Sequence, residues 1–256
     1  MLTIISPAKT LDYESPLTTR KSSTPQMLQQ SGQLVEIMRD KTPKDLQKLM
    51  KISPKLAEMN VERFKEWRPQ MDAPEARQAL LAFRGDVYLG LKAEEFTASD
   101  FSFAQKHLRI LSGLYGLLRP LDMIRPYRLE MGIKLQNPAG KDLYDFWGSE
   151  ITAMINDTLA EQRNKTLINL ASNEYAKVVQ MKKLTGEVIT PVFRDFSNGS
   201  YKVLSFFAKK ARGQMASYII RNRINKPADI RNFDVDGYRF SESHSDDQQW
   251  VFLRKA

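Results

Sequence analysis

The sequence predicts a single compact domain of mixed α/β structure that spans residues 1–256. Apolar runs of strand length occur at 2–5, 108–111 and 166–170, and small polar residues or turn formers follow each of them. Helix start signals and amphipathic stretches lie between these runs. No repeat or long linker divides the chain, and 256 residues can bury a hydrophobic core without disulfides or metal ions to stabilise it. One mixed sheet covered by many helices is therefore expected.

The first strand leads into Ser6-Pro7-Ala8-Lys9-Thr10, whose lysine could contact a phosphate or a substrate. Helices are then expected from residue 24 to about residue 83. Two short ones, within 45–67, join at Lys51-Ile52-Ser53 and resemble a helix-hairpin-helix, the unit that binds a DNA phosphate through backbone N–H groups. Lys51 and Ser53 replace the usual hairpin glycines, so an ordinary helical hairpin is the alternative.

The remaining elements follow from periodicity and turn chemistry. An Asn198-Gly199 pair between two strand-like runs predicts a tight hairpin. Thr97 starts a helix whose last residue is His107, a position that the helix dipole favours for histidine. Further helices are expected at 73–82, 142–162 and 208–223, and further strands at 187–196, 201–206, 237–240 and 250–253.

The stretch 108–131, LRILSGLYGLLRPLDMIRPYRLEM, combines a buried strand with glycines, prolines and clustered arginines. Arg119, Arg125 and Arg128 lie near prolines that fix the local backbone, and guanidinium groups bind phosphates and carboxylates bidentately. The stretch is therefore a candidate anion site. The alternative is an internal loop whose arginines pair with Asp122 and Glu130.

The net charge of +9 is unevenly distributed. Residues 202–231 carry eight basic residues against Asp229 alone, so seven of the nine net charges lie in this segment. Such a balance favours polyanionic partners, nucleic acid first, although a solvated surface helix is the alternative. The candidate DNA-binding residues of this helix are Lys209, Lys210, Arg212, Arg221 and Arg223.

The absence of cysteine excludes disulfides, thiol nucleophiles, zinc fingers and iron–sulfur clusters held by thiolates. Only two histidines exist, His107 and His244, so a metal site would need oxygen ligands. We expect neither a metal site nor a cofactor. No secretory segment or membrane-spanning apolar run is visible, so we expect a cytoplasmic protein that does not bind membranes. We also expect a monomer.

Five stretches together resemble the YaaA family of bacterial peroxide-stress proteins. They are SPAKT at 6–10, LSGLYGLLRPLD at 111–122, YRLEMG at 127–132, NLASNEY at 169–175 and AKKARGQM at 208–215. The resemblance implies a cytosolic protein, made under hydrogen peroxide stress, that lowers free iron and so limits oxidative DNA damage. It also implies a mixed α/β fold with a positively charged cleft, a helix-hairpin-helix element and binding to duplex and distorted DNA.

Three functions are weighed on these residues. In the first, the protein binds DNA largely independently of sequence, and Lys51, Ser53 and Lys55 hold phosphates at the hairpin. The cations of 208–223 and the arginines 119, 125 and 128 contact further phosphates along the DNA backbone. Tyr115 and Tyr127 stack on an unpaired base. In the second, it is an enzyme acting on a nucleotide-like small ligand, a nucleobase or a damaged DNA end, with Lys9, Asp122, Glu130 and Glu174 as candidate catalytic residues. A single pocket joining Lys9, Arg119, Arg128 and Glu174 would favour that enzyme. The third, direct iron storage, lacks a suitable ligand cluster.

Overall fold

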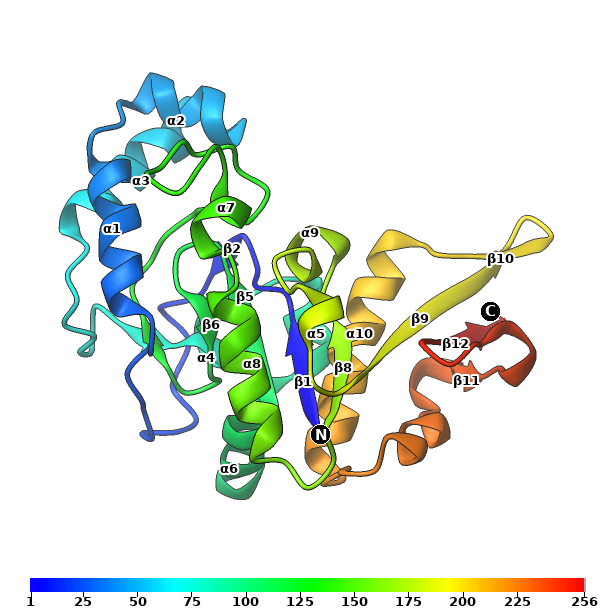
Figure 1. The fold of residues 1–256 in the computed structure, drawn as a ribbon. Coiled ribbons are helices and arrows are strands. Elements are labelled where there is room, and N and C mark those ends of the chain that lie inside the picture. Colours follow the sequence, from blue (N-terminus) through cyan, green and yellow to red (C-terminus); the bar gives the residue numbers. More distant parts are fainter. Residues whose placement is uncertain (256) are drawn as a thin grey trace.

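A computed structural model describes residues 1–255 (Figure 1). Within that range, eight strands form one mixed sheet: β1 (Leu2–Ile5), β5 (Leu108–Ser112), β6 (Gly116–Leu118), β8 (Thr166–Leu170), β9 (Glu187–Ser197), β10 (Ser200–Lys202), β11 (Arg239–Phe240) and β12 (Gln249–Arg254). Their order is β11-β12-β9-β8-β1-β5-β6, with β10 paired to β9. The predicted mixed α/β class is confirmed.

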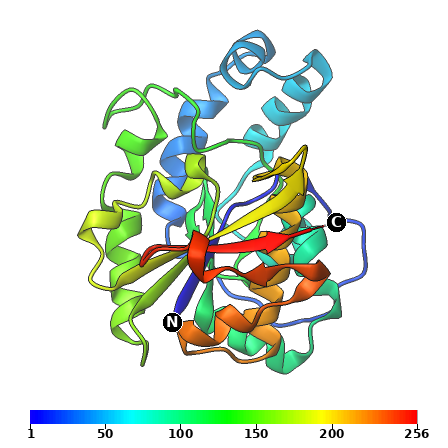
Figure 2. The same ribbon diagram turned by 90° about the vertical axis from the view of Figure 1, so that its right-hand side faces the viewer.

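The centre of the sheet is parallel and fully buried. β1 pairs in parallel with β5 on one side and with β8 on the other, and every residue of these three strands is buried. Near-continuous apolar strands of this kind require helices on both faces of a sheet. β12 and β11 extend the sheet at the far edge, where Figure 2 shows them crossing in front of the other strands.

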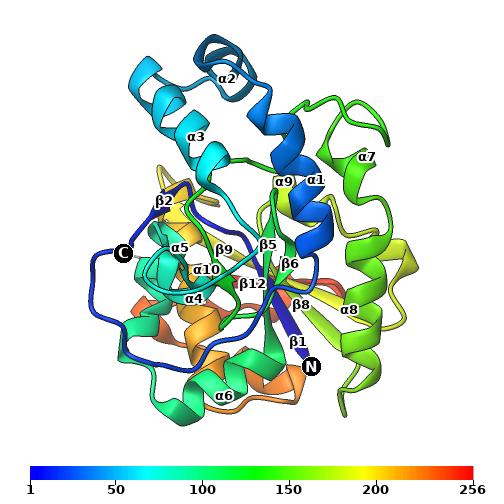
Figure 3. The ribbon, with the colours of Figure 1, turned by 90° about the vertical axis from the view of Figure 1, so that its left-hand side faces the viewer.

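The α-helices lie on the two faces of the sheet and, for α2 and α3, beyond one end of it (Figures 1 and 3). They are α1 (Leu28–Arg39), α2 (Pro43–Met50), α3 (Pro54–Glu66), α4 (Ala79–Ala82), α5 (Asp86–Leu91), α6 (Ala98–His107), α7 (Leu143–Trp147), α8 (Glu150–Ala160), α9 (Asn173–Ala176) and α10 (Ser205–Arg221). Figure 3 shows α5, α6 and α10 on one side of the sheet and α8 on the other. The chain therefore leaves β1 over one face and leaves β5 over the opposite face. The carboxyl end of β1 is the switch point at which α/β proteins place ligands.

Two antiparallel strand pairs lie outside the main sheet. β2 (Thr10–Leu11) pairs with β4 (Phe83–Arg84), and β3 (Arg77–Gln78) pairs with β7 (Met123–Ile124). The predicted helix at 73–82 is therefore wrong over most of its length, because Arg77 and Gln78 pair with β7 and only 79–82 is helical.

Two further boundaries differ from the sequence-based expectation. The helix expected at 142–162 is two helices, α7 and α8, because Gly148 ends α7 with a φ of 49° that a helix interior does not allow. The strand expected at 201–206 ends at Lys202, and α10 begins at Ser205. The helix pair α2–α3 and the Asn198-Gly199 hairpin turn are confirmed.

None of the helices within residues 1–255 has the length and apolar character needed to cross a bilayer.

Candidate functional site

The turns that follow β1 and β8 meet at the carboxyl end of the sheet. Ile5 and Leu170 are register partners, so Ser6 and Ser172 begin neighbouring turns. The Ser6 hydroxyl accepts a hydrogen bond from the backbone N–H of Ser172 at 2.9 Å and donates to the Ser172 hydroxyl at 3.3 Å. The parallel pairing therefore brings the SPAKT and NLASNEY stretches together, although they lie far apart in the sequence.

A pocket of about 440 Å³ opens between these turns, and we call it the strand-end pocket. Its walls come from the two turns, from the start of α5 and from the first half of α10. Among its lining residues are Lys9, Arg84, Asp86, Glu174, Lys209 and Arg212. Of the predicted site residues, the pocket thus joins Lys9, Glu174, Lys209 and Arg212.

Close backbone contact fixes the position of α10 beside the pocket. A Cβ atom added to Gly213 would overlap the carbonyl oxygen of Val87, and one added to Gly90 would overlap that of Lys210. These two glycines allow α10 and α5 to pack backbone against backbone. The packing holds the side chain of Arg212 next to the turn that precedes α5.

Arg212 is a partly buried cation without a counter-ion. Its guanidinium forms no ion pair with any carboxylate in residues 1–255, and burial lowers its pKa. The Lys209 ammonium lies 3.8 Å from Asp86 and its side chain is half exposed. A desolvated arginine without a carboxylate partner favours an incoming anion, because the anion restores the interactions lost with water.

Glu130 lies at the centre of an ion cluster next to the strand-end pocket. Its Oε1 atom accepts from Lys9 Nζ at 3.3 Å, from Arg128 Nη2 at 3.0 Å and from Arg128 Nε at 3.1 Å. The residue is only 8% exposed, and Oε2 is buried with no hydrogen-bond partner. A cavity of about 10 Å³, lined partly by Lys9, Arg128 and Glu130, adjoins it, which is room for about one water molecule. A buried carboxylate oxygen without a donor indicates a place for water or a ligand.

Glu174 ties the YRLEMG stretch to the turn after β8. Its Oε1 atom accepts from the Gly132 backbone N–H at 3.0 Å, and the Tyr144 hydroxyl donates to its carbonyl oxygen at 2.8 Å. Gly113 also contributes to this arrangement, because a Cβ there would overlap the Leu129 carbonyl oxygen. The side chain of Glu174 is thereby positioned at the pocket wall.

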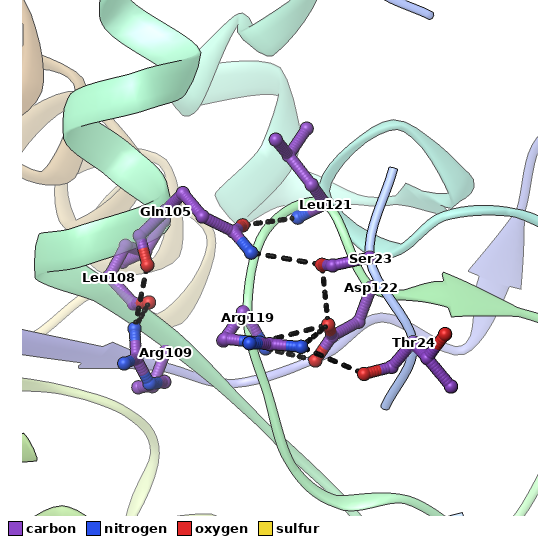
Figure 4. Close-up of polar contacts among 8 residues, drawn as sticks. All are labelled: Ser23, Thr24, Gln105, Leu108, Arg109, Arg119, Leu121 and Asp122. Atoms are coloured by element: carbon purple, nitrogen blue, oxygen red, sulfur yellow. Dashed lines mark hydrogen bonds and ion pairs between the residues drawn. The ribbon is translucent and has the colours of Figure 1, made fainter. Parts of the chain in front are cut away.

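Arg119 and Asp122 lie at the amino end of the parallel strands, away from the strand-end pocket, and their contacts contradict two predictions (Figure 4). Arg119 Nε and Nη2 donate to Asp122 Oδ1 at 3.0 and 2.9 Å, and Nη2 also donates to the Thr24 carbonyl at 2.8 Å. Asp122 is fully buried, with further bonds from the Ser23 hydroxyl and the Arg119 backbone N–H. Asp122 is therefore inaccessible as a general base. Arg119 does not reach the strand-end pocket, so the expected pocket joining Lys9, Arg119, Arg128 and Glu174 is wrong as far as Arg119 is concerned.

The prediction that Tyr115 and Tyr127 stack on a base is also wrong. Both rings are buried and pack edge to face with centroids 5.2 Å apart. The Tyr115 hydroxyl accepts from Trp67 Nε1 and from the Arg125 backbone N–H, while that of Tyr127 bonds to Ser112 Oγ at 2.6 Å. Burial raises the pKa of Tyr115 to about 12. These rings belong to the core, where no base can reach them.

Most cations of α10 and its carboxyl end are neutralised by other elements. Lys210 pairs with Asp236 at 2.9 Å, Arg221 with Glu95 at 2.8 Å and Arg223 with Asp100 at 2.7 Å. These surface pairs leave DNA binding by Lys210, Arg221 and Arg223 a prediction, while Lys209 and Arg212 line the strand-end pocket.

The other predicted cations lie apart from the strand-end pocket. Arg125 donates from Nε to the Gln70 carbonyl at 3.1 Å. Lys51, Ser53 and Lys55 are exposed at the turn between α2 and α3, where Lys51 has a φ of 53° and Ser53 caps α3 through the Leu56 N–H. Binding of DNA by this turn stays a prediction.

Two features of the site were not found from the sequence. Arg84 and Asp86 line the pocket because the β2–β4 pairing brings the start of α5 beside Lys9. Phe206 and Phe207 are exposed at the start of α10, and the adjacent aromatics before Lys209-Lys210 were a signal for them. Within residues 1–255, no group of three or more His, Asp or Glu side chains is placed to hold a metal ion.

Comparison with known protein families matches residues 1–244 to the family described as peroxide stress protein YaaA.

Proposed function

The chain belongs to the peroxide stress protein YaaA family, and from that premise we propose that it binds duplex and distorted DNA in the cytosol and so limits oxidative damage. The observation that carries the proposal is Arg212, a partly buried guanidinium at the strand-end pocket that has no counter-ion within residues 1–255. Lys9 and Lys209 add ammonium groups around the same pocket, exposed although paired with Glu130 and Asp86. Together these groups suit a phosphate-bearing polymer better than a neutral ligand.

The α2–α3 turn supplies a second contact in this proposal. Lys51 and Lys55 are exposed there, and the turn lies beyond the same end of the sheet as α9 and the start of α10 (Figure 1). Contacts of this type, through lysines and backbone N–H groups, position a DNA backbone without reading its sequence. We therefore propose that binding is largely independent of sequence and that one protomer suffices.

The test is fluorescence anisotropy with a plain duplex, a bulged duplex and a single strand of matched length across a salt series. Each phosphate neutralised on B-form DNA contributes about −0.9 to the slope of log affinity against log salt. We expect a slope steeper than about −2, with tighter binding to the bulged duplex, because Lys9, Lys209 and Arg212 surround the pocket. Weak binding with a flat slope on all three DNAs would overturn the proposal.

The lowering of free iron is, in this proposal, an indirect consequence of the protein's action rather than storage of iron by the chain. Within residues 1–255 no cluster of His, Asp and Glu side chains offers a site. Titration of the purified protein with ferrous iron under anaerobic conditions should show no tight stoichiometric binding, and a stoichiometric complex would contradict this part of the proposal.

Glu130 supports a second candidate function, an enzyme acting on a nucleotide, a nucleobase or a damaged DNA end. Its buried and unpartnered Oε2 atom is available as a general base, while Lys9 and Arg128 hold Oε1 and can stabilise negative charge on a bound group. Glu174 lies on the wall of the adjoining strand-end pocket. In this form the candidate site excludes Arg119 and Asp122.

Mass spectrometry of nucleotides and bulged oligonucleotides incubated with the protein tests that candidate. Any product formed by the wild type should disappear in Glu130→Gln, which keeps the shape of the side chain but removes its basicity. DNA affinity should be retained in the same variant. A product that persists in Glu130→Gln would remove Glu130 from the chemistry.

A further inference from the structure

Exposed phenylalanine is concentrated in one part of the molecule. Within residues 1–255, the large apolar side chains that are most exposed include three phenylalanines, Phe196, Phe206 and Phe207, all in the segment from the end of β9 to the start of α10. Figures 1 and 2 show the β9–β10 hairpin projecting from the body of the fold next to this helix. Exposed apolar groups gathered in this way mark interaction surfaces.

Phe206 and Phe207 form a supported pair. Their ring centroids are 5.6 Å apart in an edge-to-face arrangement. Phe207 is held from behind by Arg254, whose guanidinium carbon lies 4.5 Å from the ring centroid and which is itself paired to Asp195. Phe206 is 58% exposed, more than any other large apolar side chain in residues 1–255. The Phe206 ring is therefore exposed to solvent and supported by Phe207.

The cations near Phe206 indicate which kind of partner binds the exposed phenylalanines. Residues 196–212 contain no acid and include Lys202, Lys209, Lys210 and Arg212. Two of these cations contact acids of other elements, Lys209 with Asp86 and Lys210 with Asp236, and all four remain at least partly exposed. Lys209 lies three residues after Phe206, on the same side of the helix, and lines the strand-end pocket. Protein–protein interface cores are depleted of lysine, whereas proteins that bind single-stranded nucleic acid combine exposed aromatic rings with nearby cations.

We propose that Phe206, backed by Phe207, is the platform on which an unpaired base of bulged or single-stranded DNA stacks, while Lys209 and Arg212 hold the neighbouring phosphates. This inference rests on the proposed DNA binding. It supplies the aromatic contact that the buried Tyr115 and Tyr127 cannot make.

The test compares Phe206→Ala with Leu17→Ala, which removes an apolar side chain of similar exposure, 45%, outside the patch. Affinity for bulged and single-stranded DNA should fall about 5- to 150-fold in Phe206→Ala, the range for loss of one base–aromatic stack, while affinity for plain duplex stays unchanged. Phe206→Trp should restore or strengthen the preference for the bulge. The fluorescence of 2-aminopurine placed in the bulge should be quenched by the wild type and not by Phe206→Ala.

The outcomes separate this inference from the proposed function. If the wild type binds DNA with a steep salt slope and Phe206→Ala lowers affinity for all three DNAs equally or for none, the stacking platform is overturned and DNA binding stands. If the wild type binds no DNA, both fall. If the wild type dimerises in sedimentation velocity, and Phe206→Ala abolishes the dimer without changing DNA preference, the patch is an interface between copies and the inference is wrong.

Discussion

The two ends of the parallel sheet both carry ion-paired cations, and they differ in one arginine. At the amino end, Arg119 is neutralised by Asp122, and Arg109 donates from Nη1 to the carbonyls of Gln105 and Leu108 at the end of α6. At the carboxyl end, Arg212 has no counter-ion in residues 1–255. The number of cations is thus a poor guide to an anion site. What distinguishes the carboxyl end is that the described residues provide Arg212 with no carboxylate partner, whereas Lys9, Arg128 and Lys209 beside it are paired.

Cavity size does not distinguish the two ends either. A cavity of about 740 Å³ adjoins Arg109 and Arg119, which is larger than the strand-end pocket of about 440 Å³. Its walls include the carboxyl ends of α6 and α8, and Lys106 in the last turn of α6 complements that helix's dipole. Burial lowers the pKa of Arg109 to about 10, yet its bonds to two backbone carbonyls give it a structural partner.

The largest expected effect tests the structural role of the amino end. Asp122→Ala should lower the free energy of unfolding by about 3–5 kcal/mol, because it leaves the Arg119 guanidinium and the Ser23 hydroxyl without their buried acceptor. Asp236→Ala, which breaks an exposed pair with Lys210, should cost only about 0–1 kcal/mol. Urea denaturation measures both. Equal losses in the two variants would show that the Asp122 pair is not structural.

The next effect tests how the carboxyl end is positioned. Gly213→Ala should destabilise the protein by about 1–3 kcal/mol, since the added Cβ overlaps the Val87 carbonyl oxygen and forces α10 away from α5. Gly32→Ala in α1 is the matched control: nothing lies within 4 Å of its Cβ, so it should stabilise by about 0.4–1 kcal/mol. Thermal unfolding distinguishes them, and a neutral Gly213→Ala would contradict the close packing of the helices.

The sequence predicted the central strands and the paired short helices, because apolar periodicity and capping are local signals. The short strands β2, β3, β4, β6 and β7 were not predicted. The buried strands at 2–5 and 166–170 are confirmed to the residue. Which arginines pair with a carboxylate and which remain available to a ligand could not be predicted in the same way. Whether Arg119 faces Asp122 or a ligand depends on which end of β5 the chain returns to. Arg223, unlike Arg212, is paired with Asp100, an acid on another helix. The prediction that Tyr115 and Tyr127 stack on a base was wrong for a related reason, since burial of an aromatic side chain depends on tertiary packing.

The smallest effect concerns His107 at the end of α6. Burial lowers its pKa from the ordinary value of about 6.5, although the helix dipole alone would favour the charged form. The unfolded chain therefore binds the proton more readily than the folded one. Stability should be complete above about pH 6.5 and should decline as the pH falls from there toward the folded pKa. Unfolding temperatures measured against pH should show this decline in the wild type and a flatter profile in His107→Gln; identical profiles would contradict it.

The most direct test of the strand-end pocket as the binding site compares cations of one helix and its carboxyl end that line the pocket with cations that lie outside it. Lys209→Ala/Arg212→Ala and Arg221→Ala/Arg223→Ala remove the same charge, the first pair from the strand-end pocket and the second from ion pairs with Glu95 and Asp100. Salt-dependent anisotropy with a bulged duplex should show the slope reduced by about 2 in the first variant and unchanged in the second. Equal reductions in both would show that DNA responds to total charge, and that Lys209 and Arg212 at the strand-end pocket do not form the binding site.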